Sequence, residues 1–297
     1  MHNDIAKAHL DMMPITKVLC RPAEVEDRRN LASLIQFETY VHRHLDWRPP
    51  LDWLGHEPYL VAEKAERLVA ALACPPDPPG IAWIRMFAAT VKTTPEAAWE
   101  KLWPMAHEQL RKHPSVHAAA IPLHGWFRDL LQDNGFTHTH NVIVLAWENS
   151  GHTLPPAKKN TSVRSMTEED LEKVLVVDEA AFGTLWRNSL QSIELAFSQA
   201  AIATVAENEN GEISGYQIST PSPTGAHLAR LAVHPETQGQ GVGYALVRNL
   251  LLEYKDTHHR RISVNTQNDN QVSLSLYEKA GFQATGDEYP VYQFEIS

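Results

Sequence analysis

Apolar and polar positions follow two different spacings along the second half of the chain. After Thr167, which precedes three acidic residues, apolar residues recur at helical intervals, as expected for a helix with a capping side chain and an acidic first turn. Two strand-like runs then flank Asn-Glu-Asn-Gly at 208–211, and this arrangement predicts a hairpin. The remaining pattern predicts strands at 226–233, 261–266 and 289–295 and helices at 241–254 and 271–280. The second half is therefore expected to be a mixed α/β domain.

The first half repeats this order of elements with weaker signals. The pattern predicts strands at 59–65, 67–74, 81–89 and 116–121, helices at 95–112 and 126–134, and a closing strand at 142–147. Both halves also end alike, since LLQDNGFTHTHNVIVLAW and LYEKAGFQATGDEYPVYQFEI each give a helix end, Gly-Phe and a strand pair. We interpret the likeness as a duplicated domain, with a chance similarity between α/β folds as the alternative.

A stretch rich in Gly, Pro, Asn and Lys at 148–160 interrupts the apolar pattern and is typical of a domain boundary. The length supports a division, because 297 residues exceed the size at which one core usually stops growing. An apolar content of 43% and a charged content of 21% are ordinary for globular proteins, so either half can bury a core. We expect a first domain at 1–150 and a second at 161–297.

Several classes of protein are disfavoured by composition. No apolar run approaches the ~20 residues that span a membrane, and the first residues lack the pattern of a secretory signal. Cys20 and Cys74 are too few for a disulfide framework or a cysteine-based zinc site, so a cytoplasmic protein is expected. The formal charge of −10 argues against nucleic acid as a partner. It could help to attract a cationic amine, although such a charge is common among soluble proteins.

A glycine-rich loop at 238–243 joins a predicted strand to a long helix. Gly239, Gly241 and Gly243 lack a Cβ, so backbone N–H groups at the start of the helix can approach an anion such as a pyrophosphate. A P-loop would need Lys and Ser or Thr after its last Gly, and a dinucleotide loop would need another glycine spacing and a later acidic residue. The alternative is a glycine-relaxed helix start that binds no ligand.

A second motif lies about 30 residues downstream, where Asn270 is followed seven residues later by Tyr277 and then by Gly281-Phe282. Together with Gln238-x-x-Gly241-x-Gly243, this motif closely resembles the GCN5-related N-acetyltransferase (GNAT) superfamily. The resemblance covers about residues 161–297. It implies that the fold is a mixed α/β sheet of the acyl-CoA N-acyltransferase type and that acetyl-CoA is the cosubstrate.

The resemblance also implies roles for individual residues. Asn270 would contact the pantetheine region, and Tyr277 would protonate the departing thiolate, which a phenol of pKa ~10 can do. The strand before the loop would offer its backbone to the pantetheine arm, and the loop backbone would hold the pyrophosphate. The residues implied in these two backbone roles are Leu231, Ala232, Val233, Gln238, Gly239, Gln240, Gly241, Val242 and Gly243. For Tyr277 the alternative is a core aromatic on the inner face of its helix.

The sequence indicates the general base less clearly than it indicates the cofactor loop. Ribosomal-protein alanine acetyltransferases of this superfamily carry Glu five residues before the Asn, whereas this chain has Asn265, which cannot accept a proton. His227, Glu207 or a relayed water could serve instead, and His227 has a suitable ordinary pKa. The departure at Asn265 disfavours a peptide N-terminus as the acceptor.

The first half resembles an acetyltransferase domain in element order, but its counterpart of the loop, TVKTTPEAAWEKLW, contains no glycine. We therefore expect a degenerate domain in tandem with an active one. His138 and His140 share one strand face, but no nearby carboxylate or cysteine completes a metal site, so no metal is expected. Phe182 and Trp186 are expected near the acceptor amine.

The sequence thus predicts two tandem GNAT-like domains, the second an N-acetyltransferase that moves an acetyl group from acetyl-CoA to a primary amine by direct attack in a ternary complex. The acceptor would be a small molecule or a peptide, and a homodimer is compatible with this architecture. One alternative is a protein that senses acyl-CoA without turnover. Another is a structural pair of domains with a vestigial loop.

Overall fold

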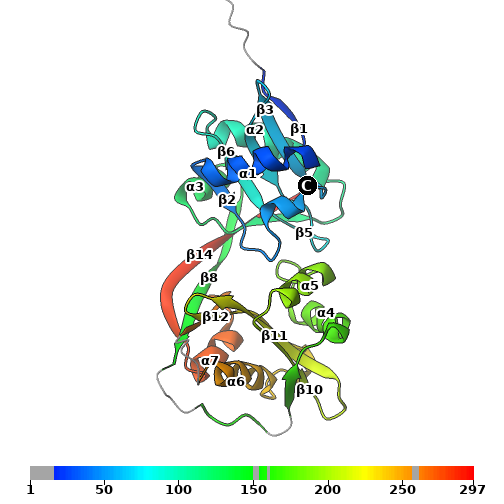
Figure 1. The fold of residues 1–297 in the computed structure, drawn as a ribbon, viewed down its shortest axis with the longest axis vertical. Coiled ribbons are helices and arrows are strands. Elements are labelled where there is room, and N and C mark those ends of the chain that lie inside the picture. The colour runs from blue at the N-terminus through cyan, green and yellow to red at the C-terminus, as the bar shows by residue number, and fades with distance from the viewer. Residues whose placement is uncertain (1–16, 150–153, 159–160, 256–260) are drawn as a thin grey trace, which may run out of the picture.

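The computed structural model describes residues 17–149, 154–158, 161–255 and 261–297, which form two lobes stacked along the long axis (Figure 1). Each lobe has a twisted sheet with helices on both faces. Two long strands, β8 (Thr137–Glu148) and β14 (Gln283–Glu295), run between the lobes. The chain is thus a mixed α/β protein built from two tandem units.

The N-terminal lobe contains a five-stranded sheet in the order β1-β3-β4-β6-β2. Leucines of α1 pack on one face of this sheet, and Trp99 and Leu102 of α2 pack on the other. Alternate residues of a strand point to opposite faces, so both faces are apolar where helices cover them. The elements of this lobe are β1 (Leu19–Pro22), α1 (Arg28–Phe37), β2 (Tyr40–Arg43), β3 (Tyr59–Lys64), β4 (Arg67–Ala73), β5 (Ile81–Trp83), β6 (Met86–Ala89), α2 (Pro95–Leu110), β7 (His117–Ala120) and α3 (Gly125–Asp133).

The C-terminal lobe belongs to a nine-stranded sheet in the order β5-β7-β14-β8-β13-β12-β11-β10-β9. Val174 of α4 and Ile193 of α5 pack on one face, whereas Tyr244 and Leu250 of α6 share a core with Tyr277 of α7 on the other. The elements of this lobe are β9 (Ser162–Ser165), α4 (Leu171–Ala181), α5 (Leu190–Ser198), β10 (Ile202–Glu207), β11 (Ile213–Ser222), β12 (Gly225–Val233), α6 (Val242–Lys255), β13 (Arg261–Gln267) and α7 (Gln271–Lys279).

The last strand of each half of the chain pairs with a strand of the other lobe. Residues Val142–Glu148 of β8 pair with β13 in the C-terminal lobe, although the sequence analysis placed this strand at the close of the first unit. Residues Tyr292–Glu295 of β14 pair in turn with β7 of the N-terminal lobe. The chain therefore crosses between lobes twice along two antiparallel strands, which makes the nine-stranded sheet continuous.

The two lobes share one arrangement of ion pairs, each built around a buried aspartate. Arg21 bonds to Asp27 and Glu63 in the first lobe, and Arg164 bonds to Asp170 and Glu207 in the second. In both cases the first strand carries the arginine, a capping aspartate follows six residues later, and the strand that pairs with the first one supplies the glutamate.

Most predicted elements are present, with three differences in extent. The predicted strand at 81–89 is broken into β5 and β6, and the strands predicted at 142–147 and 289–295 are longer, at 137–148 and 283–295. Five elements, β1, β2, β9, α1 and α5, went without a prediction, because four-residue strands and short helices give little periodic signal. None of the helices in the described parts of the chain is long and apolar enough to cross a membrane.

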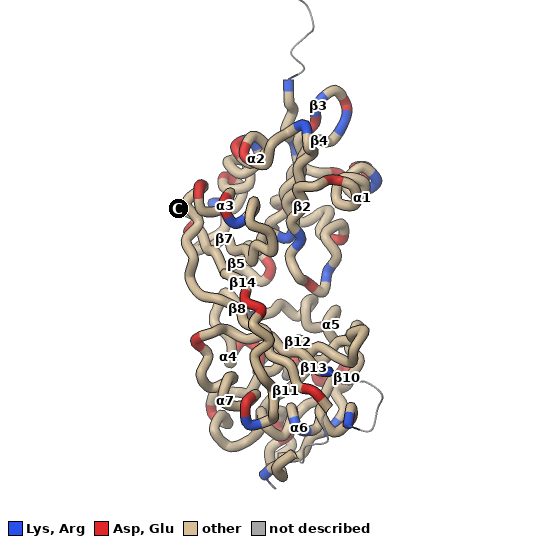
Figure 2. The backbone as a smooth tube through the Cα atoms, turned by 90° about the vertical axis from the view of Figure 1, so that its left-hand side faces the viewer, with Lys and Arg blue, Asp and Glu red and all other residues tan. Residues whose placement is uncertain are grey.

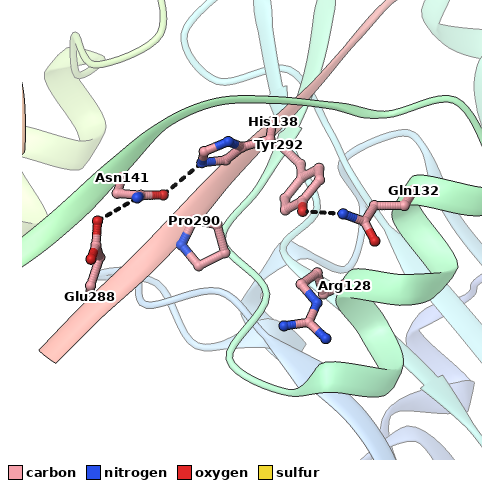
Figure 3. A pocket seen from close by; sticks show the side chains of 7 residues that line it. All are labelled: Arg128, Gln132, His138, Asn141, Glu288, Pro290 and Tyr292. Atoms are coloured by element: carbon pink, nitrogen blue, oxygen red, sulfur yellow. Dashed lines mark hydrogen bonds between the residues drawn. The ribbon is translucent and has the colours of Figure 1, made fainter.

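A pocket of about 450 Å³ lies where the strands β8 and β14 meet α3 (Figure 3). His138, one of the two histidines weighed as metal ligands, bonds here through Nε2 to Asn141 Oδ1 at 2.6 Å. Asn141 donates in turn to Glu288, and Gln132 donates to the hydroxyl of Tyr292 at 2.7 Å. These contacts join the two strands to each other and to α3, so we assign this pocket a structural role.

Candidate active site

The glycine-rich loop connects β12 to α6 in a conformation that requires glycine. Gly239 and Gly241 have φ values of +72° and +99°, in the left-handed region that other residues rarely adopt. Helix α6 begins at Val242, and the N–H groups of a first helical turn have no partner within the helix. These free donors and the helix dipole give the loop the character of an anion-binding site.

Side chains of the loop serve its internal structure, which leaves the backbone as its binding element. Gln238 donates to Val233 O at 3.1 Å and Gln240 donates to Glu236 O at 3.0 Å. Val242 is buried against Ala206. A Cβ added to Gly243 would lie 3.2 Å from Leu276 Cδ2, so this glycine lets α6 approach α7 closely.

Strand β12 separates from its parallel neighbour just before the loop. β12 and β13 pair only from Gly225–Leu228 to Arg261–Val264, and no described strand pairs with this edge of β12 beyond Leu228. Leu231, Ala232 and Val233 bond to β11 on the other side. Their backbone therefore borders a wedge between β12 and β13, open to an extended ligand.

This wedge opens into a cavity of about 600 Å³ that lies between the two lobes. From the C-terminal lobe come the predicted site residues His227, Leu231, Asn270 and Tyr277. The N-terminal lobe supplies side chains that the sequence analysis missed, because nothing in a single sequence links them to residues so far along the chain. The N-terminal lining residues are His44, Leu45, Asp46, Trp47, Asp77, Trp83, Arg85 and Ile121, and Val142 of the strand β8 also lines the cavity.

Tyr277 reaches the cavity from α7 and is 4% exposed. Burial raises the pKa of its phenol above 10.0, so the group stays protonated at neutral pH. Its ring packs against Phe282 at 5.5 Å, and no described residue hydrogen-bonds to its hydroxyl. The arrangement leaves a protonated phenol available for proton donation.

His227 lies on β12 and lines the same cavity. Its Nδ1 is 2.9 Å from Ser263 Oγ, and burial lowers its pKa below 6.5, so the ring is neutral at pH 7. Asn265 also lines the cavity, whereas Glu207 lies outside it and is paired with Arg164. Of the titratable groups weighed as a base, only His227 lies at this site.

Asn270 has a structural role in addition to its place at the cavity. It is the N-cap of α7, where its Oδ1 accepts from Ser273 N at 3.1 Å and its Nδ2 donates to Gln267 Oε1 at 3.2 Å. These bonds orient the helix that carries Tyr277.

The loop at 182–189 forms a side wall and is tied to β12 by a buried ion pair. Arg230 bonds to Asp178 at 2.6 Å and to Trp186 O at 2.7 Å, and its guanidinium lies 3.6 Å from the centre of the Phe182 ring. Asp178 is fully buried and also accepts from Tyr216 and from Asn188 N. Phe182 and Trp186 both line the cavity.

The N-terminal lobe closes the cavity with aromatic rings and a second buried ion pair. Trp83 stacks on His44 and lies 5.5 Å from Trp186 of the other lobe. Arg85 pairs with Asp46 at 2.8 Å, and both side chains are less than 10% exposed. The cavity thus lies between the loop at 182–189 of the C-terminal lobe and the residues of the N-terminal lobe that cover it.

Comparison with known proteins places these features in a family. Residues 168–282 match the Acetyltransferase (GNAT) family. The chain is 29% identical over 129 residues, 43% of its length, to 85% of the putative ribosomal protein bS18-alanine N-acetyltransferase of Bacillus subtilis (strain 168).

Solved structures resemble nearly the whole chain in fold. A tandem GNAT protein from the clavulanic acid biosynthesis pathway superimposes with a TM-score of 0.63 at 16% identity, covering 95% of this chain and 99% of that one. A probable N-acyltransferase of Enterococcus faecalis V583 gives a TM-score of 0.73 at 10% identity, with 95% and 73% covered. At these identities the likeness concerns the fold, two tandem GNAT-like domains.

Proposed function

We propose that this chain, in which residues 168–282 match the Acetyltransferase (GNAT) family, transfers an acetyl group from acetyl-CoA to a primary amine bound between the lobes. One observation carries the proposal: the open edge of β12 runs from the cavity lined by Leu231 and Tyr277 toward the glycine-rich loop that follows Val233. The left-handed glycines and the free strand edge fit a pyrophosphate and an extended pantetheine arm. Bound acetyl-CoA would supply an activated thioester.

The residues of this chain then have distinct tasks. The loop backbone at Gln238–Gly243 would bind and orient the donor, and backbone N–H groups of β12 would polarise its carbonyl. His227 would accept the proton of the attacking amine, and Tyr277 would give its hydroxyl proton to the departing sulfur. Direct attack in a ternary complex needs no covalent acyl-enzyme.

We further propose that the N-terminal lobe binds no CoA and serves instead as the roof of the acceptor site. It has no glycine loop, and the edge of β6 is occupied by β2, whereas β5 before it pairs with β7. Leu131 also stands where the other lobe has Tyr277, five residues before the Phe that follows Gly. This lobe therefore lacks both the space for the donor and the phenol.

The roofed cavity favours an acceptor that is a small molecule or a flexible segment, because a folded surface could not reach beneath the N-terminal lobe. The alanine substrate named for the B. subtilis relative is not carried over, since Asn265 here cannot act as the base. A panel of amines would identify the acceptor class.

The direct experiment is release of CoA thiol from acetyl-CoA across such a panel, preceded by thermal denaturation with and without acetyl-CoA. A ligand at about 100 times its dissociation constant should add about 2.7 kcal/mol to the free energy of unfolding. A stabilised protein that turns over no amine would favour the sensor, and no stabilisation would refute CoA binding.

A further inference from the structure

A segment between β8 and β9 is tied to the helix that starts at the glycine-rich loop. Tyr244 and Arg248, both on α6, donate to the same carbonyl, Pro155 O, at 2.8 and 2.9 Å. Leu154 packs against the core that includes α6. Residues 154–158 therefore form a strap across the first turns of α6.

The strap places the side chain of Lys158 against the glycine loop. A Cβ built on Gly241 would lie 3.2 Å from Lys158 Cδ, 3.4 Å from Cγ and 3.7 Å from Cε. The aliphatic stem thus runs along the loop, with the ammonium one bond beyond its last contact. Gly241 permits this approach as well as its own left-handed conformation.

The loop itself carries no positive side chain that could balance a pyrophosphate. From His234 to Gly243 the chain contains no Lys or Arg, and Glu236 is acidic. Arg248 is held by Pro155 O, and Lys279 lies 4.5 Å from the centre of the Tyr244 ring. Lys158 is exposed and forms no ion pair with any described residue.

We infer that Lys158 is a further cofactor-binding residue, whose ammonium pairs with a phosphate group of CoA beside the loop. The inference rests on the proposed function. It assigns the missing positive charge to a residue outside the C-terminal domain's motifs, on a strap that lies between β8 and β9 in the sequence. Lys and Arg positions lie along the backbone near α6 and α7 at this end of the molecule, next to Asp and Glu positions (Figure 2).

Calorimetric titration of the full chain with CoA and with 3′-dephospho-CoA tests the inference. Lys158→Ala should weaken CoA binding about two- to tenfold, with a smaller dependence on salt, and Lys158→Arg should restore most of the affinity. Lys173→Ala, which removes an equally exposed lysine from α4 on the opposite face of the sheet, should bind as the parent does.

The two ligands distinguish the phosphates. An equal loss with both ligands assigns Lys158 to the pyrophosphate, and a loss confined to CoA assigns it to the 3′-phosphate. Equal CoA affinity in the parent and in Lys158→Ala would overturn the inference about Lys158 but leave the proposed function intact. A parent chain that binds no CoA would overturn the proposed function and the inference with it.

Discussion

The phenol of Tyr277 differs from most buried tyrosines because its hydroxyl has no hydrogen-bond partner among the described residues. A core tyrosine usually gains a partner when it is buried, since an unpaired hydroxyl costs free energy. Its counterpart Leu131 shows that the fold itself needs only an apolar side chain here. The hydroxyl is therefore better explained by chemistry than by stability.

Replacement of Tyr277 by Phe should lower kcat about 100-fold or more, as expected for loss of a general acid. The dissociation constant for acetyl-CoA and the melting temperature should stay close to those of the parent, because no intramolecular bond is lost. Steady-state kinetics and calorimetry measure both quantities, with Tyr40→Phe in the N-terminal lobe as a matched control. Unchanged turnover would remove Tyr277 from the mechanism.

His227 gives a pH dependence with a definite sign. Burial lowers its pKa below 6.5, so the neutral, proton-accepting form predominates at pH 7 and is lost only as the pH falls below that lowered pKa. The acidic limb of the kcat profile should therefore lie below pH 6.5. In His227→Gln this limb should vanish and kcat should fall about 100-fold. A parental profile in the variant would favour a water-relayed base.

Single residues of the C-terminal site were largely predictable, because the loop and the Asn-Tyr-Gly-Phe motif lie on contiguous sequence. His227, Leu231, Asn270 and Tyr277 all line one cavity. Asp46, Trp83 and Arg85 were not predictable, since their place at this cavity depends on how two lobes meet. The sequence also contains an arginine followed six residues later by an aspartate in each half, at Arg21 and Asp27 and at Arg164 and Asp170. This repeat would have supported the interpretation as a duplicated domain.

At the scale of elements, the loop at 182–189, which forms a side wall of the cavity, is held in place by the buried carboxylate of Asp178. Asp178 is 0% exposed and holds Arg230, Tyr216 and the backbone of Asn188. Removing one partner of such a pair leaves an uncompensated buried charge.

Arg230→Ala should therefore lower the free energy of unfolding by about 3–5 kcal/mol. Chemical denaturation followed by circular dichroism measures this loss. Arg128→Ala removes an exposed pair with Asp129 and should cost less than about 1 kcal/mol. Equal effects of the two substitutions would show that the Arg230 pair contributes no more than a surface pair.

Elements in which apolar residues recur at a regular spacing were predicted better than elements without such a pattern. The helices α2, α6 and α7 lie within two residues of their predicted bounds. Strand β2, at four residues, is too short for its alternation to be read, and its importance comes from its position beside β6. The break between β5 and β6 likewise reflects a change of pairing partner, which tertiary structure decides.

At the scale of the whole molecule, the strand exchange makes each lobe depend on residues from the other part of the chain. Tyr292 lies in the last strand yet is buried in the core of the N-terminal lobe, and Phe294 packs edge-on against Trp103 at 5.5 Å. Sequence alone could not show this exchange, because the two closing strands are alike in pattern and either could complete either sheet.

Tyr292→Ala should consequently destabilise the N-terminal lobe by about 3 kcal/mol, although the substitution lies near the C-terminus. Hydrogen exchange followed by mass spectrometry should show lost protection in β7 and α3, with β11 and β12 affected least. Loss confined to the C-terminal lobe would contradict the exchange of strands.

The same exchange affects the order in which the chain can fold during its synthesis. Domains usually fold as units, the N-terminal one first, as the ribosome adds about 5–20 residues per second. Here β7 has no partner on its β14 side until residue 295 has been made. An unpaired edge of this kind can pair with other chains, so the nascent protein needs protection there while the second lobe is translated. The lobe that is begun first is the last to be completed.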